Sequence, residues 1–459
     1  MNPQHIAKLQ AIVGAENCLA DTASRIIHGY DATQSVYAPD VAVYPGNTEE
    51  VRQIMRLAYT WRIPVVPRGA GSGFSGGALP IHGGIALVLT RMNRIIEIDR
   101  ENLIAVVEPG VVTADFQRAV EKLGLFYPPD PASKEFCTLG GNIAENAGGP
   151  RCVKYGVTRD YVLGLEAISA HGDIFHTGGR TLKNVVGYDL TRLIVGSEGT
   201  LAVVTAITLK LLPKPAMKKT MLAQFSSIDG AARAVTAIIA DKIIPTTLEF
   251  MDAATISAIR TDIPIPLPDN CQAVLIIEVD GDAAQVEAHM AAIHPLIAPH
   301  DLLRGHIAAD NAEAEAIWRL RRAVSPSLKR LAPDKFNEDI VVPRAQLPEM
   351  IRALEGIAAH FQVTIVNFGH AGDGNIHVNI MVDLRQEGMK EKARQAVAAV
   401  FQAAVALGGS ISGEHGIGTA KARYLGLEID PVAMALMRRV KTAFDPENIL
   451  NPGKIFPQP

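Results

Sequence analysis

A histidine pair and a later Glu-His pair are the side chains of this sequence whose types and spacing best suit chemistry. His370 and His377 bracket a turn that contains two glycines, and Glu414 and His415 stand together between two further glycines. Two imidazoles and one carboxylate can hold a divalent cation and leave other coordination positions open. The remaining imidazole could then accept a proton. Histidines beside a hairpin are often structural, so this pattern alone leaves that role open too.

A glycine-rich element lies about three hundred residues upstream. It spans Pro67 to Gly77 and follows the apolar, strand-like run from Ile63 to Val66. Glycines allow backbone N–H groups to approach an anion closely, as in a pyrophosphate site. The spacing does not match a dinucleotide-binding Rossmann fingerprint, and the GK[ST] ending of a Walker loop is missing. The element therefore indicates either a pyrophosphate site of another kind or a surface loop.

Three more glycine-rich elements occupy the same half of the chain. They are Cys137–Gly149, which follows a proline-rich stretch ending at Ser133, then Lys154–Asp160, and finally Gly196–Thr205, which Asn184–Leu190 precedes. Four such elements together predict one large, extended, polar ligand that is wrapped by backbone. A non-haem iron centre on the histidines would leave these loops without a purpose.

Bulk properties set further limits. A chain of 459 residues is too long for one ordinary core, so at least two domains are expected. The net charge of -4 gives no reason to expect nucleic acid. The four cysteines lie far apart, which argues against a disulfide framework or an iron–sulfur cluster and favours a reducing compartment. No signal peptide and no transmembrane segment are predicted, so we expect a cytoplasmic protein that reaches a membrane only through a partner.

The segments that must position these residues form two regions, which differ in composition and in their pattern of apolar residues. Residues 41 to about 213 are rich in glycine and β-branched residues, with a helix predicted from Thr48 to Ala58 and a strand-like run at Ile194–Val195. Residues 220 to about 410 alternate apolar runs such as Ala273–Glu278 with helical patterns. This alternation predicts an antiparallel sheet with helices on one side.

With these motifs together, the chain resembles the flavoproteins of the vanillyl-alcohol oxidase and p-cresol methylhydroxylase type, from about residue 38 to the end. Within them it is similar to the group of D-lactate dehydrogenase, glycolate oxidase large subunit and D-2-hydroxyglutarate dehydrogenase. The resemblance implies an α+β fold. A two-lobed FAD-binding domain would span residues 1–215, an antiparallel-sheet substrate or cap domain 216–411, and a C-terminal segment completing the active site 412–459.

The resemblance also implies which residues hold FAD. The first loop would bind the pyrophosphate, the second would line the ribityl chain and the flavin, and Gly199 and Val204 would approach the adenine or ribityl side. Some relatives attach their flavin through a histidine in the first loop or through a cysteine. Gly71-Ser72-Gly73 has no histidine, and we find no register that places Cys137 on the ring, so noncovalent FAD is predicted. The full predicted set is Arg68, Gly69, Ala70, Gly71, Ser72, Gly73, Gly76, Ser133, Gly140, Gly141, Asn146, Gly149, Gly199 and Val204.

For the reaction, the resemblance implies flavin-dependent oxidation of a D-2-hydroxy acid, such as D-lactate or glycolate, to the 2-oxo acid. His370, His377 and Glu414 match the ligands of a divalent metal, zinc or manganese, and His415 matches the catalytic base. A metal would act as a Lewis acid on the substrate, and the flavin N5 would receive the hydride. Arg321 matches the position that grips the substrate carboxylate. Asn375 is either a substrate contact or a hairpin residue.

The resemblance leaves substrate size and electron acceptor open. The D-2-hydroxyglutarate enzymes carry a lysine shortly before a strand ending in proline. The matching stretch here is Asn337–Pro343, so that lysine is absent unless Lys335 substitutes. This favours a smaller monocarboxylate, with D-2-hydroxyglutarate as the alternative. Electrons must pass to an external acceptor or partner protein, a homodimer is compatible with the sequence, and a non-catalytic flavin-binding subunit is the alternative of another class.

Overall fold

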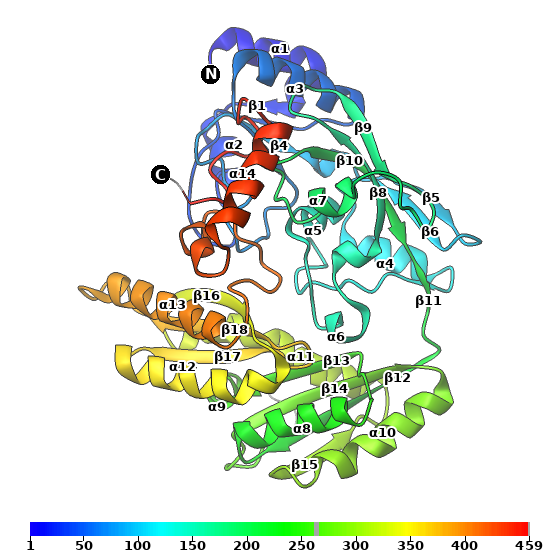
Figure 1. Cartoon of the computed structure of the whole chain (residues 1–459), viewed down its shortest axis with the longest axis vertical. Helices are drawn as coiled ribbons and strands as arrows, with labels where there is room; N and C mark the ends of the chain where they lie inside the picture. Colours follow the sequence, from blue (N-terminus) through cyan, green and yellow to red (C-terminus); the bar gives the residue numbers. More distant parts are fainter. Residues whose placement is uncertain (261–265, 458–459) are drawn as a thin grey trace. The chain divides into compact units, whose positions relative to one another are not determined.

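The computed structural model describes residues 1–260 and 266–457, and these form two compact units (Figure 1). The first unit comprises residues 1–148, 157–214 and 414–459. The second unit comprises residues 149–156 and 215–413. The domain limits expected from the sequence stay a prediction. No helix of the described residues is long and apolar enough to cross a membrane.

The first unit contains a four-stranded sheet with the order β1-β2-β4-β3, in which β2, β4 and β3 are parallel. The buried strand β3 ends at Arg68, so the first glycine-rich loop starts at the carboxyl end of a parallel strand, where α/β sheets commonly bind ligands. The strands are β1 (Cys18–Leu19), β2 (Val41–Val43), β3 (Val65–Arg68) and β4 (Ile85–Val88), and the helices beside them are α1 (Pro3–Val13), α2 (Thr22–Ile27) and α3 (Thr48–Trp61).

Helix α3 follows the sequence pattern that predicted it. Asn47 caps its first turn by accepting a hydrogen bond from the Glu50 N–H at 3.0 Å, and Glu49 and Glu50 lie at the positive end of the helix. The helix continues past the predicted end at Ala58 and stops at Trp61, where Arg62 adopts the left-handed conformation. Sequence signals therefore located the start of this helix better than its end.

A second, antiparallel sheet of the first unit has the order β5-β6-β10-β8-β9. Two sheets in this unit confirm the expected two-lobed α+β arrangement. The strands are β5 (Ile95–Asp99), β6 (Ile104–Val107), β8 (Val162–Ile168), β9 (Ile174–Gly178) and β10 (Val203–Lys210), with the small pair β7 (Leu125–Phe126) and β11 (Leu212–Pro213). The remaining helices are α4 (Thr113–Glu121), α5 (Leu139–Glu145), α7 (Leu190–Ile194) and α14 (Pro431–Phe444).

One local prediction in this unit was wrong. Ile194 was expected in a strand-like run, but it ends the short helix α7. Asp189 caps that helix by accepting a hydrogen bond from the Arg192 N–H at 2.9 Å. The capping residue outweighs the β-propensity of two branched side chains.

The second unit is built on one antiparallel sheet with the order β15-β12-β14-β13-β17-β18-β16, as expected. Its strands are β12 (Met217–Phe225), β13 (Thr247–Asp252), β14 (Ala273–Gly281), β15 (Leu302–Ile307), β16 (Asp334–Val341), β17 (Thr364–His370) and β18 (Asn375–Val382). Its helices are α6 (Cys152–Tyr155), α8 (Ile228–Ala240), α9 (Ala253–Ile259), α10 (Ala283–Ile297), α11 (Asn311–Ser327), α12 (Leu347–Phe361) and α13 (Met389–Ala406).

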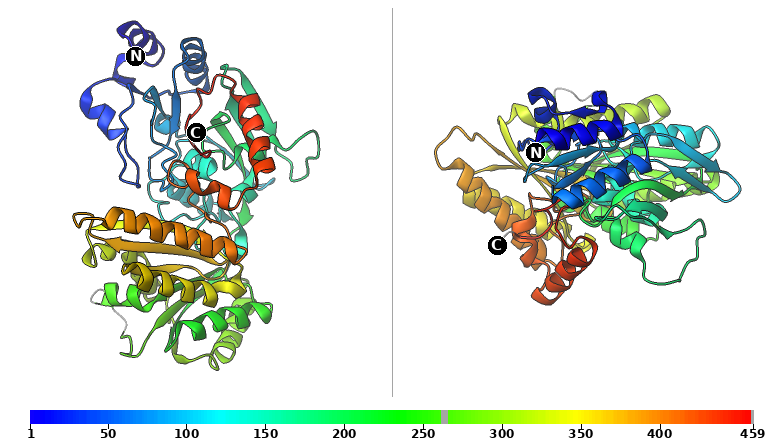
Figure 2. Two further views of the ribbon diagram at one scale, coloured as in Figure 1. Left: turned by 60° about the vertical axis from the view of Figure 1, so that its left-hand side comes forward. Right: turned by 90° about the horizontal axis from the view of Figure 1, so that it is seen from above.

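Helices cover both faces of this sheet, so the expectation of helices on one side was wrong (Figure 2). Helices α8, α10, α12 and α13 pack together on one face, while α9 and α11 pack on the other. The reason is visible in β14, whose residues from Ala273 to Asp280 are all buried. A continuous run of buried residues that is mostly apolar is typical of a strand covered on both sides.

Candidate functional site

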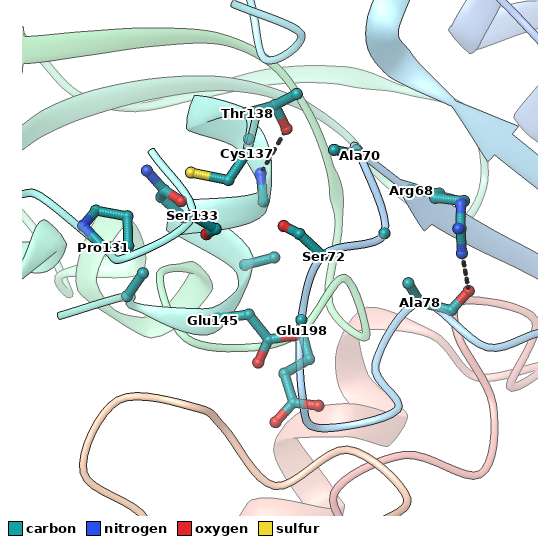
Figure 3. A pocket seen from close by; sticks show the side chains of 18 of the residues that line it. Arg68, Ala70, Ser72, Ala78, Pro131, Ser133, Cys137, Thr138, Glu145 and Glu198 are labelled. Atoms are coloured by element: carbon teal, nitrogen blue, oxygen red, sulfur yellow. Dashed lines mark hydrogen bonds between the residues drawn. The ribbon is translucent and has the colours of Figure 1, made fainter. Parts of the chain in front are cut away.

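The first unit contains a pocket between its glycine-rich loops (Figure 3). Glu198, Glu414 and His415 also line it. Ten of the predicted FAD-binding residues line this pocket: Arg68, Gly69, Ala70, Gly71, Ser72, Gly73, Ser133, Gly140, Gly141 and Gly199. The residues that line it do not include Gly76, Asn146, Gly149 or Val204, whose roles stay predictions.

Glycine is required at the centre of the first loop. Gly71 has a φ of +70°, and a Cβ atom there would overlap the guanidinium of Arg68. Arg68 is buried and donates to the carbonyl oxygens of Tyr30 at 2.7 Å and Ala78 at 3.3 Å. A Cβ at Gly69 would overlap the hydroxyl of Thr138 in the second loop. The two loops thus form a cradle of backbone that fits an extended polar cofactor.

Cys137 lines the same pocket but is poorly suited to covalent attachment. Its thiol is buried and lies 3.3 Å from the hydroxyl of Thr113. Burial raises the pKa of this thiol. Because the thiolate is the nucleophilic form, a raised pKa disfavours nucleophilic attack by Cys137.

Two acidic side chains meet beside the turn that carries His415. Figure 3 shows the carboxyl groups of Glu145 and Glu198 next to each other in the pocket. Glu145 accepts a hydrogen bond from the Ser75 hydroxyl at 2.9 Å, and Glu198 accepts one from the Ile417 N–H at 2.8 Å. Burial, and then repulsion by Glu198, raises the pKa of Glu145 well above its ordinary value. Burial also raises the pKa of Glu198.

The position of His415 is fixed from two sides. Its imidazole stacks on the ring of Phe74 from the first loop, with centroids 5.0 Å apart and an angle of 24° between the planes. The next residue, Gly416, has a φ of +87°, and a Cβ atom there would overlap the carboxyl group of Glu145. His415 is therefore held at the wall of the cofactor pocket by contacts within its own unit.

In the second unit, His370 ends β17 and His377 lies in β18, and the tight turn between the strands is as predicted. Gly374 has a φ of +86° and donates its N–H to the carbonyl of His370 at 3.1 Å. The two buried imidazoles place their Nε2 atoms 3.3 Å apart. Two nitrogens of a tetrahedral zinc site, with Zn–N distances of about 2.0–2.1 Å, lie roughly 3.3–3.4 Å apart. The donor pair therefore fits a divalent cation.

Each of these imidazoles has a buried carboxylate behind it. His370 binds the Oε1 atom of Glu249 through Nδ1, and the Nδ1 atom of His377 lies 3.7 Å from the Oδ1 atom of Asp339. Both carboxylates are 0% exposed. Strand register explains the arrangement, because Glu249 lies opposite His370 and Asp339 opposite His377, and opposite residues share a sheet face. Carboxylates of this kind fix the ring orientation and tautomer of metal-binding histidines.

Arg321 reaches the same sheet face from α11. Its Nε donates to the Oε2 atom of Glu249 at 2.6 Å, and its guanidinium lies over the ring of Phe368, 4.6 Å from the centroid. Among the described residues, Nη1 and Nη2 of Arg321 have no hydrogen-bond partner. Burial would raise the pKa of Glu249, but the charges of His370 and Arg321 outweigh it and lower that pKa. By contrast, Arg322 is exposed and pairs with Glu315.

Four other polar side chains lie on the neighbouring strands β16 and β18. Asn375 donates its amide hydrogens to the Oδ1 atom of Asp339 at 2.5 Å and the carbonyl of Ile340 at 2.9 Å. Its Oδ1 atom is buried without a hydrogen-bond partner in the described part of the chain. Asn337 donates to Asn379 at 2.8 Å. Lys335 donates to the Ser325 hydroxyl of α11 at 3.2 Å.

The family follows from comparison with known proteins. Residues 39–178 match the model of the FAD binding domain, and residues 214–455 match that of the C-terminal domain of FAD linked oxidases. The chain belongs to the FAD-linked oxidase family. It is 48% identical to the glycolate oxidase subunit GlcD of Bacillus subtilis (strain 168), over 98% of this chain and 96% of that one.

Other members of the FAD-linked oxidases are similar over almost the whole chain. The D-lactate dehydrogenase of Anaerostipes hadrus is 34% identical, over 99% of this chain and 98% of that one. The D-2-hydroxyglutarate dehydrogenase of Stutzerimonas stutzeri (strain A1501) is 32% identical, over 99% of both chains. A solved structure of p-cresol methylhydroxylase is 18% identical and superposes with a TM-score of 0.81, covering 98% of this chain and 96% of that one. The expected flavoprotein fold is confirmed, as is FAD as the cofactor of this enzyme family.

Sequence reasoning missed four acidic side chains at the candidate sites of this FAD-linked oxidase. Glu145 and Glu198 carry a weak signal, because each is an acidic residue inside a glycine-rich, otherwise uncharged motif. Glu249 and Asp339 carry none that is local, since they lie 121 residues from His370 and 38 residues from His377, respectively. Only the order of the strands brings these carboxylates to the histidines.

Proposed function

We propose that this FAD-linked oxidase oxidises a small 2-hydroxy monocarboxylate, such as D-lactate or glycolate, to the 2-oxo acid. The observation that carries this proposal lies on one sheet face of the second unit, where the guanidinium of Arg321 and the first member of the histidine pair, His370, both contact Glu249. A 2-hydroxy acid offers the matching groups, a hydroxyl for the cation and a carboxylate for the fork. Relatives named for glycolate, D-lactate and D-2-hydroxyglutarate support the substrate class.

FAD is proposed to be bound noncovalently. The first loop has no histidine, and Cys137 is buried with a raised pKa. When bound, FAD supplies the acceptor for the hydride that leaves the substrate carbon. The loops of the first unit would hold FAD. The backbone from Gly69 to Gly73 and the side chains of Ser72 and Ser133 face the pocket.

A divalent cation, zinc or manganese, is proposed on His370, His377 and Glu414. The Nε2 spacing of the two imidazoles supports the first two ligands. The third rests on the family resemblance and on chain connectivity, because Glu414 directly follows Gly413, whose N–H is held by Asp339 at 2.9 Å. Such a cation would act as a Lewis acid on the substrate hydroxyl.

The chain's own residues then divide the remaining tasks. The Nη1 and Nη2 atoms of Arg321 bind the substrate carboxylate as a planar fork. His415 accepts the hydroxyl proton, since an imidazole titrates near neutral pH and this one faces the cofactor pocket. The unpartnered Oδ1 atom of Asn375 is the atom through which that residue contacts the substrate.

Substrate size is the point on which the relatives differ. Asn337 occupies the position of the lysine that the resembled D-2-hydroxyglutarate enzymes use, and its amide is engaged by Asn379. Lys335 does not compensate, because its ammonium group is turned to Ser325 on α11. A second carboxylate on the substrate would thus lack a cation, which favours a monocarboxylate.

Electrons leave the flavin for an external acceptor or partner protein, because no second redox cofactor motif occurs in the sequence. The similar B. subtilis protein is named as a subunit, which supports a protein partner.

The proposal is tested by steady-state turnover of D-lactate, L-lactate, glycolate and D-2-hydroxyglutarate with an artificial electron-accepting dye. We expect turnover of D-lactate or glycolate, with a lower kcat/KM for D-2-hydroxyglutarate and none for L-lactate. The His415→Ala variant, which leaves the FAD loops intact, is the control for dye reduction that does not use the active site. A protein that holds FAD and metal yet oxidises none of these acids would instead be a non-catalytic flavin subunit.

A further inference from the structure

Glu249 makes contact with both halves of the candidate substrate site. Its Oε1 atom binds His370 Nδ1, and its Oε2 atom accepts the Arg321 Nε–H at 2.6 Å. It lies on β13 and is 0% exposed, so no bulk water replaces either partner. A single buried carboxylate thus links a cation-binding imidazole to a substrate-binding guanidinium.

The neighbouring contacts leave both partners little freedom. His370 lies directly opposite Glu249 in the β13–β17 ladder. Arg321 rests on the ring of Phe368, which is two residues before His370 on the same strand and the same sheet face. Moving either partner away would leave a buried charge without its counter-charge, which is costly in a low-dielectric interior.

Asp339 offers an internal comparison. It stands behind His377 as Glu249 stands behind His370, and it is equally buried. Its other contacts include the Asn375 amide at 2.5 Å and the Gly413 N–H at 2.9 Å, whereas the Nε–H of Arg321 is donated to Glu249. The two carboxylates therefore share the imidazole contact and differ in the contact with Arg321.

We infer that Glu249 is a positioning residue that couples the cation site to the grip on the substrate carboxylate. This inference rests on the proposed function and goes beyond it. One oxygen turns His370 so that Nε2 faces the cation, and the other holds Arg321 by Nε so that Nη1 and Nη2 face the substrate. Binding of the cation and binding of the substrate carboxylate are then linked through one side chain, and each strengthens the other.

The test compares Glu249→Gln with Asp339→Asn in the FAD-loaded enzyme. An amide has one acceptor and one donor end, so a glutamine at this position cannot accept hydrogen bonds from both His370 and Arg321. Zinc affinity without substrate, measured by competition with a chromogenic chelator, should fall roughly 10–100-fold in both variants. At saturating zinc, the substrate KM should rise about 10-fold or more in Glu249→Gln alone, as expected for a lost charge-assisted hydrogen bond.

Arg321→Lys provides a second route that leaves Glu249 and His370 in place. It should raise KM without weakening zinc binding in the absence of substrate. Combined with Glu249→Gln, it should add little further to KM, because both changes remove the same grip. Should Glu249→Gln prove unstable, Glu249→Asp, which keeps the charge but is one methylene shorter, would replace it in both comparisons with the same expected results.

The opposing results are equally distinct. An unchanged KM at saturating zinc in Glu249→Gln, or fully additive effects in the double variant, would overturn the coupling while leaving the proposed function intact. A wild-type enzyme that binds no divalent cation, or that oxidises no 2-hydroxy acid, would remove the proposed function and the coupling together.

Discussion

The candidate sites of the two units are built in opposite ways. The pocket of the first unit is walled by backbone, and its central residues are glycines because a Cβ atom would overlap the loop itself, as at Gly71. The candidate site of the second unit is made of charged side chains, each fixed by a buried carboxylate, as Glu249 fixes Arg321. An extended cofactor is bound by many weak backbone contacts, whereas a small acid needs a few strong contacts in fixed directions.

This contrast predicts the largest effect when a side chain is added to the glycine loop of the backbone-walled pocket. Gly71→Ala places a side chain at a φ of +70° and against the Arg68 guanidinium. We expect the purified variant to lose most of its FAD, measured as the ratio of flavin to protein absorbance. Gly179→Ala is the matched control, because a Cβ atom there meets nothing within 4 Å. Wild-type FAD content in Gly71→Ala would show that the cradle tolerates side chains and would break the contrast.

A smaller effect is expected from removing one functional side chain at the pocket wall. His415→Ala should keep both FAD and metal, but flavin reduction by substrate should slow by about two to four orders of magnitude, the usual contribution of a positioned base. Stopped-flow reduction under anaerobic conditions measures this rate. Glu414→Ala distinguishes the role of a metal ligand from that of the base, since this variant should lose the metal. Reduction of His415→Ala at the wild-type rate would exclude this residue as the base.

A change of specificity should be smaller again. Asn337→Lys restores a cation at the position where the resembled D-2-hydroxyglutarate enzymes have one. We expect kcat/KM for D-2-hydroxyglutarate to rise relative to that for D-lactate by about 10-fold, the effect of one charged contact of roughly 1.4 kcal/mol. Asn337→Gln controls for the added length without the charge. An equal ratio in all three proteins would contradict the assignment of this position to substrate size.

The smallest effect is expected on stability, from the carboxyl group of Glu145 beside Glu198 in the backbone-walled pocket. Burial and Glu198 raise the pKa of Glu145 well above 4.5, so the folded protein holds an extra proton above that pH. Unfolding then takes place with proton loss, and stability falls as pH rises from 4.5 through the raised pKa. Glu145→Gln should lack this slope, so its melting temperature should improve relative to wild type as pH rises. Exposed Glu135 provides the control, Glu135→Gln, and parallel curves for Glu145→Gln and wild type would argue against the shift.

Local signals predicted the parts of the molecule that are local in space. The cap at Asn47 predicted the start of helix α3. The turn with two glycines, the second of which is Gly374, predicted the hairpin between His370 and His377. The four glycine-rich elements predicted a large, extended, polar ligand because close backbone contacts require glycine, and the family resemblance identified that ligand as FAD. The wrong strand at Ile194 and the missed second helical layer came from reading propensity without caps and without the burial of both faces of β14.

The candidate site of the second unit could not be predicted in the same way. Glu249, Arg321 and His370 come from a strand, a helix and a second strand, and the sheet order β14-β13-β17-β18-β16 brings them together. No spacing in the sequence encodes that order. Only the family resemblance predicted Arg321 as a site residue. Nothing in the sequence predicted Glu249, the carboxylate that accepts its hydrogen bond.

We propose a metal-dependent reaction in which a 2-hydroxy acid reduces FAD held by the glycine-rich loops. The most direct test is anaerobic reduction of the bound flavin by D-lactate and by glycolate, before and after treatment with a chelator and after zinc or manganese is added back. The account predicts rapid bleaching of the flavin in the metal-loaded protein, an unchanged flavin spectrum but no reduction after chelation, and recovery with the metal. Reduction at the full rate in metal-free protein would contradict it.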